Sequence, residues 1–129
     1  VDNVDMHPFA LSDSELTGYM TLRRKVNYGT GYFLPGPGTV ETVKIDDFTP
    51  GPVDLIYLDI EGREIEALKG AERTIERDNP VIAVEQKVLG DIQGEGKPIP
   101  YRSDVVIPYL KELGYKEVRS VHADHVYMR

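Results

Sequence analysis

The chain has 129 residues, enough for one domain with its own hydrophobic core. With 22 acidic residues against 15 basic ones, its formal net charge is −7, which argues against nucleic-acid phosphates as a partner. It contains no cysteine, which excludes disulfides and thiolate metal sites. No stretch resembles a membrane span or a signal peptide, so we expect a soluble, cytoplasmic protein without a membrane partner.

The first part of the chain is predicted to form short strands. Apolar residues indicate strands over residues 1–11 and 16–22, with a turn at 13–15 between them. Residues 27–38 are rich in Gly, Pro and Tyr and are predicted to be a loop. Residues 40–45 alternate enough to form another short strand.

The central stretch has the pattern strand, acidic turn, helix, strand. Val53 to Leu58 is a short apolar run, typical of a strand buried on both faces. A helix is predicted from Gly62 to just before Asn79-Pro80, because a residue before proline is pushed out of the α region. A second apolar strand follows over 81–84. The helix carries one apolar stripe, made of Ile65, Leu68, Ala71 and Ile75.

Three acidic residues follow these two predicted strands. A β-α-β unit of this length forms a right-handed crossover between parallel strands. In parallel sheets, ligands bind beyond the carboxyl ends of the strands. Asp59, Glu61 and Glu85 all lie at that edge, so we expect their side chains to cluster there.

The last third is predicted to hold a loop, a helix and a hairpin. Residues 90–102 are polar and rich in Gly and Pro, as in a functional or mobile loop. A helix is predicted over 103–113, with Pro108 kinking it or delaying its start. Residues 115–121 and 126–129 are predicted to pair as antiparallel strands.

The central stretch also resembles a known family. Residues 55–75, LIYLDIEGREIEALKGAERTI, and 80–86, PVIAVEQ, are similar to the central motif of the FkbM-type S-adenosylmethionine-dependent methyltransferases. That motif is a strand ending in Asp-x-Glu-Gly, a further Glu, a Leu-Lys-Gly-Ala helix, and a Pro-led strand ending in an acid. Residues 10–12 and 44–48 resemble family segments more weakly. Tyr57 departs from the pattern, because the family often has Lys there.

The resemblance implies a partial Rossmann-like class I methyltransferase sheet over residues 1–129, with parallel strands, crossover helices and a C-terminal antiparallel hairpin. It also implies S-adenosylmethionine as cofactor. Such enzymes cradle the cofactor on a Gly-rich turn between a strand and a helix. The glycine pairs at 29–31 and 36–38 follow no predicted buried strand and open no helix. We therefore expect a carboxy-terminal portion of the domain, with no cofactor-binding residues of its own.

The site residues each have two interpretations. Asp59 is expected to be catalytic, contacting a ligand or taking a proton from a hydroxyl, but it could also cap the helix. Glu61 and Glu64 could act with Asp59, but the helix dipole also favours acids in a first helical turn. Glu61 is the better candidate of the two, because it lies in the turn itself. Glu85 could serve the same chemistry, or it could pair with Lys87 or with a loop amide. No metal is assigned, because a divalent ion needs further oxygen ligands.

Other polar residues are weaker candidates. His122 and His125 are interpreted as part of a polar turn rather than a metal site. Tyr28, Tyr32 and Tyr101 lie in predicted loops over the catalytic edge, where they could stack on a ligand.

Two functions remain open. The first is a portion of an O-methyltransferase acting on a hydroxyl of a small molecule or sugar, as the resemblance implies. The second is a non-catalytic half-domain that self-associates and binds no cofactor. In either case the strand 53–58 is expected at an open edge, where Leu55, Ile56 and Tyr57 are exposed. We expect this edge to form a homodimer; the alternative is that residues 1–11 fold back to cover it.

Overall fold

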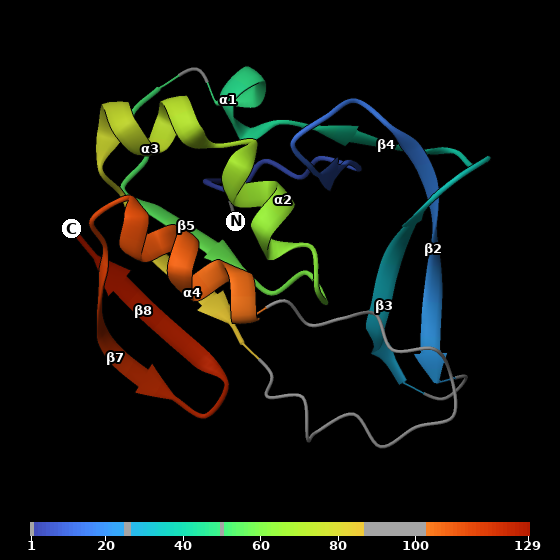
Figure 1. The fold of residues 1–129 in the computed structure, drawn as a ribbon. Coiled ribbons are helices and arrows are strands. Elements are labelled where there is room, and N and C mark those ends of the chain that lie inside the picture. Colours follow the sequence, from blue (N-terminus) through green and yellow to red (C-terminus); the bar gives the residue numbers. More distant parts are fainter. Residues whose placement is uncertain (1, 25–26, 50, 87–102) are drawn as a thin grey trace.

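The computed structural model describes residues 2–24, 27–49, 51–86 and 103–129 (Figure 1). This part of the chain is mixed α/β, with two four-stranded sheets of orders β1-β4-β2-β3 and β5-β6-β8-β7. The strands are β1 (Ala10–Leu11), β2 (Thr17–Arg24), β3 (Asn27–Pro35), β4 (Val40–Val43), β5 (Leu55–Leu58), β6 (Val81–Glu85), β7 (Lys116–Val121) and β8 (Asp124–Met128). The helices are α1 (Ile45–Phe48), α2 (Glu64–Lys69), α3 (Glu72–Asp78) and α4 (Ser103–Glu112). None of the helices described is long and apolar enough to cross a membrane.

The N-terminal strand is much shorter than predicted. Within the described residues 2–11, only Ala10 and Leu11 form a strand, and they pair in parallel with β4 rather than with β2. The expected hairpin between residues 1–11 and 16–22 is therefore wrong. Acidic residues and Pro8, which has no backbone N–H, precede β1 and weaken the strand pattern there.

The segment predicted to be a loop contains strand β3, which pairs in antiparallel fashion with β2. Its glycines concealed a strand that is otherwise rich in aromatic residues. Gly18 in β2 allows this pairing, because a Cβ there would lie 2.2 Å from the carbonyl oxygen of Leu34 and 2.3 Å from the ring of Phe33. Gly38 packs in the same way, since its Cβ would lie 1.9 Å from the carbonyl oxygen of Gly18.

The second sheet has the predicted pairing but not the predicted burial. Strands β5 and β6 are parallel neighbours, and β7 and β8 form the predicted C-terminal antiparallel hairpin. Strand β5 stands at the end of the sheet. The prediction that it is buried on both faces is wrong, because its residues alternate between exposed and buried. Leu55 and Tyr57 are each 56% exposed, whereas Ile56, expected to be exposed, is buried.

The central helix is interrupted. The predicted single helix is divided into α2 and α3 at Gly70-Ala71, where Gly70 packs on the backbone of Ser12. A Cβ on Gly70 would lie 2.2 Å from the carbonyl oxygen of Ser12, so only glycine allows this approach. Helix α3 ends as predicted, with Asn79 in the left-handed conformation before Pro80.

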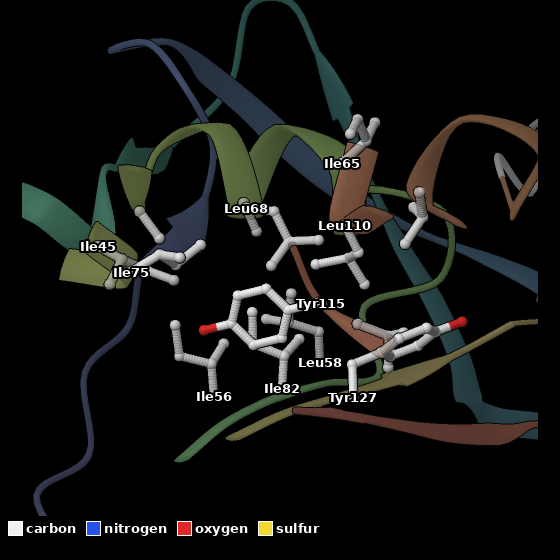
Figure 2. Packing of buried hydrophobic residues seen from close by; sticks show 14 residues of the cluster. Ile45, Ile56, Leu58, Ile65, Leu68, Ile75, Ile82, Leu110, Tyr115 and Tyr127 are labelled. Atoms are coloured by element: carbon white, nitrogen blue, oxygen red, sulfur yellow. The ribbon is translucent and has the colours of Figure 1, made fainter. Parts of the chain in front are cut away.

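The core lies between one face of the second sheet and the helices. Figure 2 shows Ile56, Leu58 and Ile82 of the strands facing Leu68 and Leu110 of the helices. The predicted stripe of α2 and α3 is buried in this core, as expected. Helix α4 runs from Ser103 to Glu112 with Pro108 inside it. The predicted loop over 90–102 lies outside the described residues.

Candidate functional site

Three carboxylates meet at the carboxyl ends of β5 and β6. Asp59 directly follows β5, Glu61 lies in the turn after it, and Glu85 is the last residue of β6. One oxygen of each side chain lies within 4.8 Å of the other two. The parallel register, in which Leu58 pairs with Val84, brings the two strand ends together. The predicted clustering of Asp59, Glu61 and Glu85 is confirmed.

The turn that carries Asp59 and Glu61 has an unusual backbone. Glu61 has a φ of 55° and Gly62 a φ of 102°, so two successive residues lie at positive φ. Gly62 adopts its positive φ without steric cost, because glycine has no Cβ. Glu64 fixes the turn, because its Oε1 accepts hydrogen bonds from the amides of Ile60 (3.2 Å) and Gly62 (3.1 Å).

Helix capping does not explain Asp59. Helix α2 begins at Glu64, and Arg63 at the N-cap makes no capping hydrogen bond with its side chain. Asp59 lies four residues before that N-cap position, and its side chain belongs to the carboxylate cluster instead. Glu64, not Asp59, satisfies the free amides of this turn. Burial raises the pKa of Glu64, and the nearby charge of Asp59 raises it further against the lowering effect of those amides.

The negative charge of the cluster extends to Tyr57. Its phenol donates a 3.2 Å hydrogen bond to Oδ1 of Asp124 on β8. The charge of Asp124 is the largest cause of the raised pKa of Tyr57, and Asp59 and Glu85 add to it. Lys87, the alternative partner of Glu85, lies outside the described residues.

The cluster could hold a cation through one oxygen from each of its three residues. Among the described residues, no other group of His, Asp and Glu has this spacing. Mg²⁺ takes six oxygen ligands and Ca²⁺ six to eight, so water or substrate would have to supply the remainder. The two histidines of the hairpin are not part of such a group. His125 pairs with Glu117 at 3.1 Å, and His122 is exposed in the turn.

A pocket of about 500 Å³ opens beside the cluster, with Asp59 in its wall. Arg63 also lines it and stacks on Phe33 of β3, with the guanidinium carbon 5.6 Å from the ring centroid. The sequence did not reveal the role of Arg63, because its partner Phe33 is thirty positions away in a segment predicted as loop.

The structure places the tyrosines differently from the prediction. Tyr28 and Tyr32 lie on strand β3 rather than in a loop. Tyr32 lines the pocket beside Asp59, as expected of a residue near the site. Tyr101 lies outside the described residues.

The comparisons with known proteins agree with the resemblance. The family model of the methyltransferase FkbM domain matches residues 2–117. The chain therefore belongs to the FkbM family of S-adenosylmethionine-dependent methyltransferases. No curated protein and no solved structure matches it.

The structure also places the two glycine pairs considered in the sequence. Gly29 and Gly31 lie within strand β3, and Gly36 and Gly38 lie in the turn from β3 to β4. Neither pair stands between a strand and the start of a helix, where backbone amides would meet the polar groups of a nucleoside.

Proposed function

We propose that the chain is the acceptor-handling part of an O-methyltransferase that acts on a hydroxyl of a small molecule or sugar. The observation that supports it is the meeting of Asp59, Glu61 and Glu85 within 4.8 Å at the carboxyl edge of a parallel strand pair. Methyl transfer to oxygen needs a positioned hydroxyl and a group that removes its proton. A carboxylate cluster in a methyltransferase family suits both tasks.

Each carboxylate has a distinct role in this proposal. Asp59 is exposed and lies in the wall of the pocket, so it accepts the proton of the acceptor hydroxyl. Glu61 is 6% exposed and is held by the backbone of a tight turn, so it orients the hydroxyl. Glu85, at the end of β6, completes the negative site from the neighbouring strand.

The proposal also concerns the fold. The order β5-β6-β8-β7, with one parallel pair followed by an antiparallel hairpin, suits one side of a Rossmann-like class I methyltransferase sheet. In this interpretation residues 1–129 are one methyltransferase-like domain, and the sheet β1-β4-β2-β3 borders the acceptor.

Methyl transfer from labelled S-adenosylmethionine tests the proposed function. The donor is supplied at millimolar concentration, because its binding to this chain is expected to be weak, with a panel of hydroxyl compounds and sugars as acceptors. Asp59→Asn should lower transfer by about 10²–10⁴-fold, the usual contribution of a general base. Asp54→Asn, an exposed acid just before β5, is the matched control and should leave transfer unchanged. Transfer that is equal in both variants would contradict the role of Asp59.

The exposed end of the second sheet favours a second candidate, a non-catalytic unit that self-associates. Strand β5 is the end strand, and Leu55 and Tyr57 are exposed on it. Pairing this edge with a second copy would complete the backbone ladder and extend the sheet face on which both side chains lie. In this proposal the chain is a homodimer joined through β5.

Light scattering at micromolar concentration tests the dimer. Leu55→Lys should shift the mass toward the monomer, 14.5 kDa by composition. Val118→Lys on β7 is the control, because Val118 is 55% exposed, close to the 56% of Leu55, but lies at the other end of the sheet. A wild-type chain that is monomeric throughout would rule out the dimer.

A further inference from the structure

We propose that the pocket beside Asp59 binds the carbon body of the acceptor, and that this acceptor is an apolar hydroxyl compound rather than a free sugar. The inference rests on the proposed function and specifies the substrate class of that site. Three features carry it: the chemistry of the lining, the two charged residues in the wall, and the size of the pocket.

The lining is predominantly apolar and comes from both sheets. Segment 8–11, strands β2 and β3, the start of β4 and the turn after β5 all contribute to the wall. Met20 of β2 is 55% exposed and Phe9 is 40% exposed, so apolar surface is open to a ligand here. Covering such surface with an apolar ring contributes about 25 cal/mol for each Å² removed from water. The apolar lining residues are Pro8, Phe9, Ala10, Leu11, Met20, Phe33, Val40 and Ile60.

Two charged residues in the wall determine how a ligand is oriented in the pocket. Asp59 joins the pocket to the carboxylate cluster, so a hydroxyl donating to Asp59 also lies within reach of the other acids. Arg63 is held by Phe33 and by Glu66, whose Oε1 lies 3.6 Å from Nη1. Its guanidinium therefore gives the pocket wall one positive charge.

The same lining disfavours a free sugar. A sugar ring carries several hydroxyls, and each loses its hydrogen bonds to water on entering the pocket. Apart from Tyr32, Asp59 and Arg63, the side chains of this wall offer no strong polar partner. A volume of about 500 Å³ falls within the usual range for a drug-sized molecule. An alicyclic or aromatic compound with one hydroxyl fits these conditions better than a polyol.

The experiment measures binding without any methyl donor. The full chain, labelled at its methyl groups, is titrated with 2-naphthol and separately with methyl β-D-glucopyranoside. We expect 2-naphthol to shift the methyl signals of Met20, Val40 and Ile60, with an affinity at least tenfold higher than that of the glucoside. We also expect 2-methoxynaphthalene, which has no hydroxyl proton, to bind more weakly than 2-naphthol. That difference should disappear in Asp59→Ala, which removes the acceptor oxygen.

A pair of methionine variants provides the control. Met20→Glu places a charge in the pocket wall and should weaken 2-naphthol binding at least tenfold. Met128→Glu changes a strand residue of similar exposure (48%) outside the pocket and should leave binding unchanged. Three results would overturn the proposal. The glucoside could bind as tightly as 2-naphthol, the shifts could be confined to residues outside the pocket, or the two folded variants could bind 2-naphthol equally. If Met20→Glu does not fold, the methyl shifts of the wild-type chain and its relative affinities for 2-naphthol and the glucoside still test the proposal.

The result is independent of the transfer assay. Selective 2-naphthol binding without methyl transfer would leave the pocket standing and count against the proposed function. Methyl transfer that depends on Asp59, with no binding of 2-naphthol in the pocket, would support the proposed function and overturn the pocket proposal.

Discussion

Tyr57 on β5 and Asp124 on β8 are joined by a 3.2 Å hydrogen bond that reaches across the intervening strand β6. Asp124 pairs in register with Glu85, so this bond ties the C-terminal hairpin to the strand end that carries the carboxylate cluster.

The first prediction concerns the titration of Tyr57. Its pKa is raised chiefly by the charge of Asp124, so Asp124→Asn should return it toward its ordinary value of about 10. A raised pKa in the folded state means that the contribution of the phenol to stability is complete below about pH 10 and is lost as the pH rises further. Ring-carbon NMR of labelled tyrosine against pH measures the change. The same titration curve in Asp124→Asn as in wild type would contradict the assignment, and Asp54→Asn serves as control.

Substitution of Glu64 should stabilise the chain. Burial raises the pKa of Glu64, so its unfavourable effect on stability appears as the pH rises above the unfolded value of about 4.3 and grows until the folded pKa is passed. Glu64→Gln keeps an acceptor for the amides of Ile60 and Gly62 but removes the charge that faces Asp59. We expect a higher free energy of unfolding than wild type at about pH 7, and a smaller difference near about pH 4.

Urea denaturation at the two pH values tests this effect. Glu76→Gln, which changes a side chain 80% exposed, should alter stability by less than about 0.5 kcal/mol at either pH. Loss of stability in Glu64→Gln at neutral pH would show that the charged form is needed for the turn.

The stability that Asp46 contributes by capping α3 should be measurable. Asp46 of α1 accepts hydrogen bonds from the amides of Thr74 (2.7 Å) and Arg73 (3.0 Å), so it satisfies the first turn of α3 from another helix. Asp46→Ala should cost about 1 kcal/mol of unfolding free energy, the usual value for a lost cap. Asp47→Ala removes only an exposed ion pair with Arg73 and should cost less, about 0–1 kcal/mol.

The pH dependence of the Asp46 effect has a definite sign. Burial alone would raise the pKa of Asp46, but the hydrogen bonds from Arg73 and Thr74 outweigh it and lower the pKa. The stabilisation is therefore present above the unfolded value of about 3.9 and is lost as the pH falls through the folded pKa. Thermal unfolding of Asp46→Ala and wild type should converge in acid. A constant difference across that range would contradict the role of the carboxylate.

Binding of the methyl donor to this chain should be weak. Both glycine pairs lie in β3 and the following turn, so neither provides amides at a helix start for the polar groups of S-adenosylmethionine. Calorimetric titration should give no saturable binding at micromolar concentration. A dissociation constant in the low micromolar range, about −8 kcal/mol, would contradict this expectation.

The sequence predicted the site better than it predicted the sheets. Asp59, Glu61 and Glu85 were found because a β-α-β unit determines where the ends of its strands meet, and this geometry is local in sequence. The burial of β5 was not predictable in the same way. Whether Leu55 and Tyr57 are covered depends on which elements lie beside them, and an apolar run carries no information about its neighbours.

The other errors also come from contacts distant in sequence. Strand β3 was mistaken for a loop because its glycines suggest turns, whereas close packing of the β2–β3 hairpin requires a glycine at position 18. The break between α2 and α3 depends on the approach of Gly70 to Ser12, fifty-eight positions earlier. Neither contact leaves a periodic pattern that could be recognised in one sequence.

At position 61, selection for stability and selection for the carboxylate cluster favour different residues. A side chain at a φ of 55° costs about 1–2 kcal/mol of backbone strain that glycine would not incur. Laboratory evolution for thermal tolerance alone would therefore favour Glu61→Gly and, with it, the loss of one carboxylate from the cluster. A glutamate retained at this position under such pressure would be evidence that it is kept for its chemistry.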